Sequence, residues 1–171
     1  MNINVIEIVI LIILIPFALA GMSLAPWVPT RKKDYIRGLK LVEFKKGDNF
    51  YEIGSGDGRV TFYAGKNHDI NARGIEICYP IYLYAKIKNI IQKNRNISFE
   101  NADLFKYDFS DADVIYLYGM PDKNPKLIDK FRKELKKGTK IISYTFEIKG
   151  LEPIEISKPT ENDLPIYLYE F

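Results

Sequence analysis

The pattern of hydrophobic positions divides the chain into two parts. Residues 8–25 read IVILIILIPFALAGMSLA, an apolar run without a charged residue. Beyond residue 33, short apolar runs with the length of buried strands alternate with segments whose apolar residues recur every three or four positions. The second pattern is typical of an α/β domain with a mainly parallel sheet.

The second part predicts five strands interleaved with helices, and then two strands with no helix between them. The predicted strands lie at 49–53, 72–76, 97–100, 114–118, within 136–146, at 152–157 and at 166–171. The predicted helices lie at 33–42, 59–66, 80–94 and 124–135. Because two strands joined without a helix pair antiparallel, we expect the sheet to end in a C-terminal antiparallel hairpin.

The N-terminal run predicts one transmembrane helix. It has 18 residues, and Val5 and Ile6 beyond Glu7 extend it to the length of about 20 residues that crosses a bilayer. A cleaved signal peptide is the first alternative, because ALA at 18–20 resembles a cleavage site; however, no Lys or Arg precedes the run. A buried core helix is the second, but a domain this small offers little to cover it. A membrane anchor is the preferred interpretation.

The basic residues around this run predict its orientation. Seven Lys and Arg residues lie between positions 31 and 46, and none precedes the run. The positive-inside rule therefore places the C-terminal domain in the cytoplasm. The expected localisation is the cell membrane, with a single span.

Composition narrows the chemistry that the chain can carry. It holds 25 Lys and Arg against 22 Asp and Glu, and this net charge of +3 is too small to indicate nucleic-acid binding by itself. Cys78 is the one cysteine and His68 the one histidine, so no disulfide and no Cys/His metal site are expected. Backbone groups, carboxylates, hydroxyls and a bound cofactor must carry the chemistry.

A glycine-rich loop follows the first predicted strand, in FYEIGSGDGRV at 50–60. It holds three glycines, Gly54, Gly56 and Gly58. Dinucleotide sites use G-x-G-x-x-G with a pyrophosphate at the helix N-terminus, whereas the third glycine here comes one residue early. Because Asp57 and Glu52 would repel a pyrophosphate, we expect a ligand without phosphate that carries positive charge. S-adenosylmethionine, with an ammonium and a sulfonium group, meets both conditions.

Two further acids follow the next strands of the predicted sheet. Glu76 ends the second strand, where an acid commonly accepts hydrogen bonds from ribose hydroxyls. Asp103 follows the third strand and can accept from an adenine amino group. A solvated turn acid or a helix cap is the alternative for each. Acids that follow three consecutive strands favour a ligand site at the carboxyl ends of the strands.

These motifs resemble class I (seven-β-strand) S-adenosylmethionine-dependent methyltransferases, which have a Rossmann-like fold. A narrower likeness is to a group of small protein-lysine methyltransferases, which includes an archaeal broad-specificity enzyme and membrane-anchored mitochondrial relatives acting on the ATP synthase c-subunit and the adenine nucleotide carrier. The segments that carry it are PWVPT at 26–30, YEIGSGDGRV at 51–60, DVIYLY at 113–118 and ELKKGTKIISYTF at 134–146.

The resemblance implies S-adenosylmethionine as the cofactor and a lysine as the methyl acceptor. It also implies that the Pro-x-Val-Pro-Thr segment covers the cofactor, which makes Thr30 a candidate ligand-contacting residue. One position departs from the group's pattern. The group commonly has His and Asp after the serine of the fifth strand, where this chain has Tyr144-Thr145-Phe146.

Methyl transfer to lysine requires a neutral amine. Neutralising a lysine at pH 7 costs about 4.6 kcal/mol, and a dry aromatic pocket with hydroxyl acceptors lowers that cost. Tyr118, at the end of the fourth strand, is the first candidate for positioning the amine, and Tyr144 of the fifth strand is the second. The alternative for both is an ordinary strand aromatic.

The sequence thus predicts a transmembrane anchor at 1–25, a hinge and cofactor-covering segment at 26–33 and a methyltransferase domain at 34–171. The predicted function is methyl transfer from S-adenosylmethionine to an accessible, juxtamembrane lysine of a protein, with no nucleic-acid partner. One alternative is a small-molecule or RNA acceptor, although YGMPD stands after the fourth strand where base methyltransferases have Asn-Pro-Pro-Tyr. A second alternative is a non-catalytic membrane module that binds S-adenosylmethionine.

Overall fold

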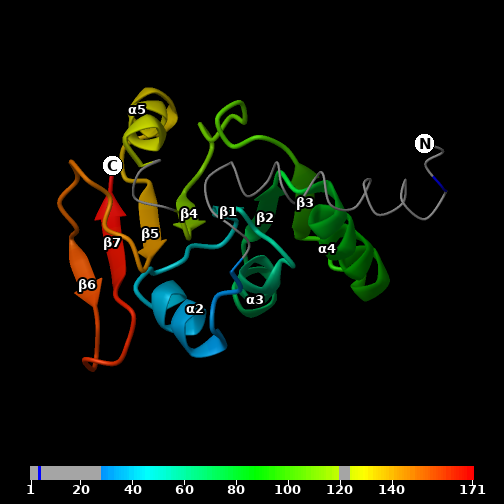
Figure 1. Ribbon diagram of the computed structural model, residues 1–171, viewed down its shortest axis with the longest axis horizontal. Coiled ribbons are helices and arrows are strands. Elements are labelled where there is room, and N and C mark those ends of the chain that lie inside the picture. Colours follow the sequence, from blue (N-terminus) through cyan, green and yellow to red (C-terminus); the bar gives the residue numbers. More distant parts are fainter. Residues whose placement is uncertain (1–3, 5–27, 120–123) are drawn as a thin grey trace.

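A mixed seven-stranded sheet organises the computed structural model, which describes residues 4, 28–119 and 124–171 (Figure 1). The strands are β1 (Asn49–Ile53), β2 (Asn71–Glu76), β3 (Ile97–Asn101), β4 (Val114–Leu117), β5 (Lys140–Tyr144), β6 (Glu155–Ser157) and β7 (Ile166–Glu170). Their order across the sheet is β3-β2-β1-β4-β5-β7-β6. The first five strands run parallel, and β7 pairs antiparallel with both β5 and β6.

Helices cover the two faces of the sheet unequally. The helices are α2 (Lys32–Leu39), α3 (Arg59–Asn67), α4 (Tyr79–Gln92) and α5 (Asn124–Glu134). The first three pack on one face, around a core that includes Phe50 and Tyr116, and α5 packs on the other (Figure 1). The connection from β3 to β4 has no helix, and its residues Leu104 and Phe109 fill the core beneath α5.

The C-terminal hairpin is confirmed, because β6 and β7 pair antiparallel. The sequence did not indicate that β7 also inserts next to β5. Burial explains the order: Ile166, Leu168 and Tyr169 of β7 are buried, whereas Glu155 and Ile156 of β6 are exposed. The more apolar strand therefore takes the internal position and the other becomes the edge.

The bounds of most elements agree with the sequence within a few residues. β1 has the predicted bounds, and β6 begins three residues later than predicted. Pro153, which cannot donate a ladder hydrogen bond, lies in the part of the predicted strand that does not form. The helix expected at 33–42 is α2, which ends at Leu39.

Among the described residues, no helix is both long and apolar enough to cross a membrane. The span predicted at 8–25, and with it the anchor at 1–25, lies outside those residues. Of the hinge at 26–33, the structure describes the positions from Val28 onward.

Candidate active site

A pocket lies at the carboxyl ends of β1 and β4, where neighbouring strands connect in opposite directions along the sheet. This is the place at which open α/β sheets bind ligands. Its lining residues are Val28, Pro29, Thr30, Glu52, Ile53, Gly54, Ser55, Gly56, Asp57, Arg59, Tyr116 and Tyr118. The predicted glycine loop and the predicted covering segment therefore meet in one site.

The glycine loop takes a conformation that needs its glycines. Gly54, Gly56 and Gly58 have φ angles of 70°, 53° and 76°, in the left-handed region that side chains disfavour. A Cβ atom on Gly58 would lie 2.4 Å from the ring of Phe99, whereas one on Gly54 would meet no atom within 4 Å. The loop thus packs tightly on β3 at its end and borders open space at its start.

Glu52 is buried beneath this loop. Its Oε2 atom accepts hydrogen bonds from the backbone nitrogen of Thr61 at 2.8 Å and from the Thr61 hydroxyl at 2.5 Å. Burial raises the pKa of Glu52 to about 8, although the bonds from Thr61 favour the charged form. Neither bond uses Oε1, so this oxygen is available to a ligand in the pocket that Glu52 lines.

Asp57 does not carry the free charge that the sequence argument assumed. The Arg59 guanidinium contacts its carboxylate through two atoms, at 2.9 and 2.7 Å. Burial alone would raise the pKa of Asp57, but the bonds from Arg59 hold it below its usual value. Arg59 also donates to the carbonyl oxygen of Thr30 at 3.3 Å. The expectation that an uncompensated charge on Asp57 repels a pyrophosphate is therefore wrong. The Asp57–Arg59 pair also ties the covering segment to the start of α3.

The other two predicted acids bind backbone groups. The buried Glu76 accepts from the backbone nitrogens of Gly56 at 2.9 Å and Cys78 at 2.8 Å, which joins the glycine loop to the end of β2. Burial raises the pKa of Glu76. Asp103 accepts from the backbone nitrogen of Phe105 at 2.9 Å. Neither acid belongs to the pocket lining, and their ribose and adenine roles stay predictions.

The two candidate tyrosines occupy different places. The half-buried Tyr118 lines the pocket, and its ring centroid lies 4.8 Å from that of Tyr144 and 5.8 Å from that of Phe146. Tyr144 is buried behind it, and its hydroxyl donates to Asp34 at 2.8 Å. The structure thus places Tyr118 in the pocket lining and Tyr144 behind it, and their roles in positioning an amine stay predictions.

Tyr116 also lines the pocket; its strand position faces the predicted site, but the sequence favoured Tyr118 and Tyr144 over it as candidates. Its ring is 1% exposed, and within the described ranges its hydroxyl has no partner in hydrogen-bond geometry. Burial raises the pKa of Tyr116 well above its usual value, against a smaller opposing influence of the Thr30 side chain, so the hydroxyl keeps its proton. Periodicity places Tyr116 and Tyr118 on one face of the strand but does not tell which of the two is buried.

A buried carboxylate positions the covering segment, and the sequence did not reveal it. Asp34 is fully buried and accepts from Arg31 at 2.6 Å, Arg37 at 3.1 Å and the Tyr144 hydroxyl. Burial alone would raise the pKa of Asp34, but these hydrogen bonds hold it below its usual value. The network ties the residues directly after Thr30 to β5.

The lining fits S-adenosylmethionine. Two buried hydroxyls in it, Ser55 Oγ and Tyr116 OH, have no partner among the described residues and can bind polar groups of a ligand. Oε1 of Glu52 can accept from an ammonium group, and the open space beside Gly54 admits a ligand to the loop backbone. In the described part of the chain, no group of three or more His, Cys, Asp and Glu residues could hold a metal ion.

Comparison with known sequences supports this assignment. The ANTKMT methyltransferase domain matches residues 52–155. A protein-lysine N-methyltransferase of Saccharolobus islandicus (strain REY15A) is 33% identical over 150 residues, which cover 84% of this chain and 92% of that protein. The lysine N-methyltransferase of the ATP synthase c-subunit from Rattus norvegicus is 27% identical, over 75% of this chain and 59% of the rat protein.

Solved structures show the same fold. An RNA methyltransferase from Salinibacter ruber in complex with S-adenosyl-L-homocysteine is 31% identical, with a TM-score of 0.78 over 84% of this chain and 93% of that one. Phosphoethanolamine N-methyltransferase 2 of Haemonchus contortus, in complex with S-adenosyl-L-methionine, shares the fold alone, with 18% identity and a TM-score of 0.60 over 76% of this chain and 31% of that one. The chain is an S-adenosylmethionine-dependent methyltransferase and belongs to the ANTKMT methyltransferase domain family.

Proposed function

We propose that this methyltransferase modifies a lysine side chain of a protein. The observation that carries the proposal is the 33% identity to a protein-lysine N-methyltransferase over most of both chains. The rat relative, whose name also specifies a lysine acceptor, supports the same class of substrate. The pocket supplies the surroundings that such an acceptor needs.

The acceptor amine must arrive neutral at the site. When bound, S-adenosylmethionine supplies an electrophilic methyl group on a positively charged sulfur. Neutralising a lysine at pH 7 costs about 4.6 kcal/mol, and an aromatic wall that excludes water reduces this cost. Tyr118 lines the pocket, and its ring contacts those of Phe146 and Tyr144. These three residues form the wall that receives the amine.

Hydroxyl groups orient the amine. The Tyr116 hydroxyl is neutral, buried and without a partner among the described residues, so it is free to hold a ligand atom. Tyr118 lies beside it in the lining and bounds the entrance. Positioning and desolvation therefore supply the rate enhancement, in agreement with a site built mainly from aromatic and small residues.

Residues 1–25 anchor the enzyme to the cell membrane, with the methyltransferase domain in the cytoplasm. The uncharged run and the seven basic residues after it support this part of the proposal. Thr30 lines the pocket only five positions after Ala25, and five extended residues span at most about 17 Å. The favoured substrates therefore carry lysines close to the membrane surface.

An RNA acceptor is the second candidate, and the Salinibacter ruber enzyme favours it. One transfer experiment separates the two. The full chain is incubated with methyl-labelled S-adenosylmethionine and with membranes and total RNA from the source cell. The lysine proposal predicts label that proteases release and ribonucleases do not. Label released by ribonuclease would support the RNA acceptor, and cofactor binding without transfer would support a non-catalytic module.

Truncation tests the anchor separately. Removing residues 1–24 should leave the affinity for S-adenosylhomocysteine unchanged, because the described lining begins at Val28. Methylation of the target in intact membranes should fall, while methylation of a soluble lysine peptide should not. Unchanged methylation of the membrane target would contradict the proposed anchor and leave the lysine acceptor unaffected.

A further inference from the structure

The outward side of α4 exposes a row of large apolar side chains. Ile90 and Ile91 are 65% and 72% exposed, which is unusual for isoleucines on a helix that already packs on a sheet. The residues of this row, here named the α4 apolar face, are Tyr79, Leu83, Tyr84, Ile87, Ile90 and Ile91. Their spacing of three, four and seven positions places them along one side of the helix. A shallow hollow near its end is lined by Tyr84, Ile87, Lys88, Ile91 and Gln92.

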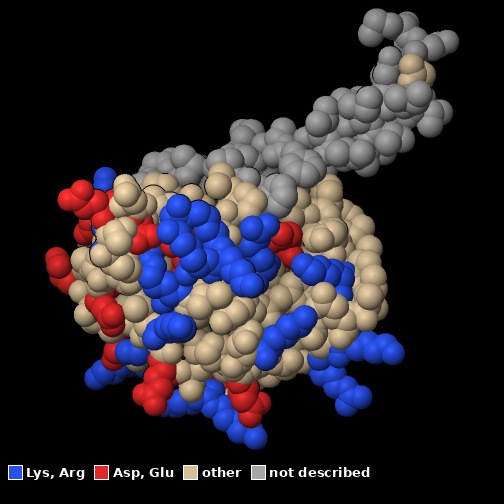
Figure 2. All heavy atoms as spheres, turned by 90° about the horizontal axis from the view of Figure 1, so that it is seen from below, with Lys and Arg blue, Asp and Glu red and all other residues tan. Residues whose placement is uncertain are grey.

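Basic residues surround this face, and acids are absent from it. The basic residues in the segment 77–99 are Lys86, Lys88, Lys93 and Arg95, and the segment contains no Asp or Glu. Within the described ranges, none of the four forms an ion pair. Acidic side chains gather at the left and centre of Figure 2, whereas its right-hand end, where Figure 1 places α4, shows basic side chains over uncharged surface.

Lys88 illustrates how these residues serve an apolar surface. Its Nζ atom lies 4.8 Å from the ring centroid of Phe62 and 5.8 Å from that of Tyr84. The aliphatic stem can therefore cover aromatic surface while the charge stays at the boundary with water, as lysines do at membrane interfaces. Exposed isoleucines and tyrosines with lysines that form no ion pair within the described ranges are the composition of an interfacial helix.

The charge pattern decides which of three partners fits the α4 apolar face: a second copy of the chain, the apolar run at 8–25 or a lipid surface. A second copy of the chain would bring four basic residues against four equivalent ones. The apolar run at 8–25 has no charge to match them. An anionic lipid surface satisfies both features, because acyl chains accept the isoleucines and headgroups attract the lysines.

We propose that the α4 apolar face docks on an anionic lipid bilayer, with α4 lying in the headgroup region. The helix begins three residues after Glu76, at the end of the sheet that carries the pocket. Docking therefore holds the pocket end of the sheet near the lipid surface. This contact is additional to the proposed N-terminal anchor, and it does not depend on the identity of the methyl acceptor.

A fluorescence experiment on the full chain tests the proposal. An environment-sensitive label is attached through Ile91→Cys, with Ile156→Cys on β6 as the control; both positions are exposed, and the native Cys78 is 1% exposed and protected from labelling. Each protein is reconstituted in vesicles of phosphatidylcholine, with or without phosphatidylglycerol. We expect the label at position 91 to shift to the blue and brighten only in anionic vesicles, and the label at 156 to stay unchanged.

Charge variants provide the matched control. Lys86→Gln, Lys93→Gln and Arg95→Gln are combined in one protein, and Lys126→Gln, Lys133→Gln and Lys137→Gln, on and directly after α5, in another. Removing the charges beside the α4 apolar face should weaken docking by about fivefold for each residue, and removing those of the second set should not. Equal shielding of position 91 in neutral and anionic vesicles would overturn the proposal, because a second copy or the apolar run gives that result. Equal effects of the two triple variants would overturn it as well.

Discussion

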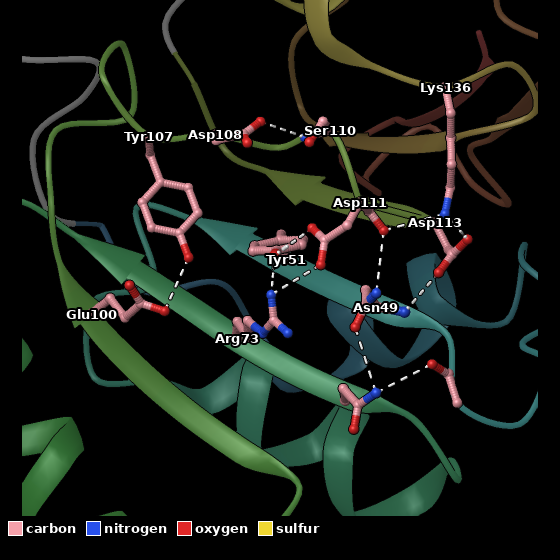
Figure 3. A network of polar contacts seen from close by, with 12 residues as sticks. Asn49, Tyr51, Arg73, Glu100, Tyr107, Asp108, Ser110, Asp111, Asp113 and Lys136 are labelled. Carbon is pink, nitrogen blue, oxygen red and sulfur yellow. Dashed lines mark hydrogen bonds and ion pairs between the residues drawn. The ribbon is translucent and has the colours of Figure 1, made fainter.

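The pocket and the polar network in Figure 3 contain adjacent residues of β1, Glu52 and Tyr51. They differ in whether their buried polar groups have hydrogen-bond partners. In the network, the Tyr51 hydroxyl donates to Asp111 at 2.7 Å, and Arg73 contacts both of these residues. Tyr107, in the connection from β3 to β4, donates to Glu100 at 2.9 Å. The polar side chains drawn in Figure 3 thus bond to one another or to nearby backbone groups. The network fastens that helix-free connection to the sheet.

In the pocket, by contrast, the hydroxyls of Ser55 and Tyr116 are buried without a partner among the described residues. Leaving buried polar groups unpaired costs stability, and within a pocket lining a ligand can supply the missing bonds. We therefore expect the network to serve stability and the pocket to serve binding. Substitutions in the two regions should therefore affect different measurements.

The largest expected effect comes from Tyr116→Phe. We expect methyl transfer to fall about 100-fold, which is typical for loss of a positioned hydrogen-bonding group. The free energy of unfolding should stay within about 0.5 kcal/mol, because the lost hydroxyl has no partner to leave behind. Steady-state kinetics and urea unfolding measure the two quantities. A matched Tyr144→Phe variant should leave methyl transfer nearly unchanged. It should lower the free energy of unfolding by about 1–2 kcal/mol, because it removes the bond to Asp34.

The second effect comes from Asp111→Ala, on the network side. This substitution removes the acceptor of Tyr51 and the ion pair of Arg73, and we expect about 1–2 kcal/mol of destabilisation because the carboxylate is partly exposed. The affinity for S-adenosylhomocysteine, measured by calorimetry, should not change. A loss of affinity in a stably folded variant would break the proposed separation of the two regions.

The third effect is a pH dependence carried by Glu52, whose pKa is about 8. A cation in the pocket favours the ionised carboxylate, so affinity for S-adenosylhomocysteine should rise from pH 6 to 8, by at most about tenfold per pH unit. Because the pKa is raised in the folded state, folding stability from this group falls as pH rises between about 4.5 and 8. Glu52→Gln should abolish both trends. A steep affinity profile retained in this variant would assign the trend to another group.

The smallest effect is expected for Ser55→Ala. Loss of one neutral hydrogen bond to the ligand should weaken S-adenosylhomocysteine binding about fivefold, with stability unchanged. Differential scanning fluorimetry with and without ligand measures both. A loss of stability without ligand would mean that Ser55 has a structural partner.

The surroundings of the glycine loop could be predicted because their signals are local. Glu52, the three glycines and Glu76 lie at the ends of two adjacent strands, and the structure brings them together around one loop. Local spacing could not show that Arg59 neutralises Asp57, because the directions of these side chains depend on the left-handed conformation at Gly58. Class and cofactor were therefore predicted correctly, although one electrostatic premise was wrong.

The proposed acceptor part of the site could not be predicted to the same depth because its contacts are distant in sequence. Asp34 and Tyr144 are 110 positions apart, and no spacing rule indicates their hydrogen bond. The insertion of β7 next to β5 likewise depends on which strand is more apolar, which becomes decisive only after the sheet forms. Because of these long-range contacts, Tyr118 lines the pocket while Tyr144 is buried behind it.

The most direct test of the central claim is tandem mass spectrometry of the methylated acceptor. The full chain is incubated with membranes and isotope-labelled S-adenosylmethionine, and labelled proteins are digested and sequenced. We expect labelled methyl groups on the side-chain nitrogen of a lysine, and their loss with Tyr116→Phe. Label confined to a nucleotide or to another amino-acid side chain would contradict it.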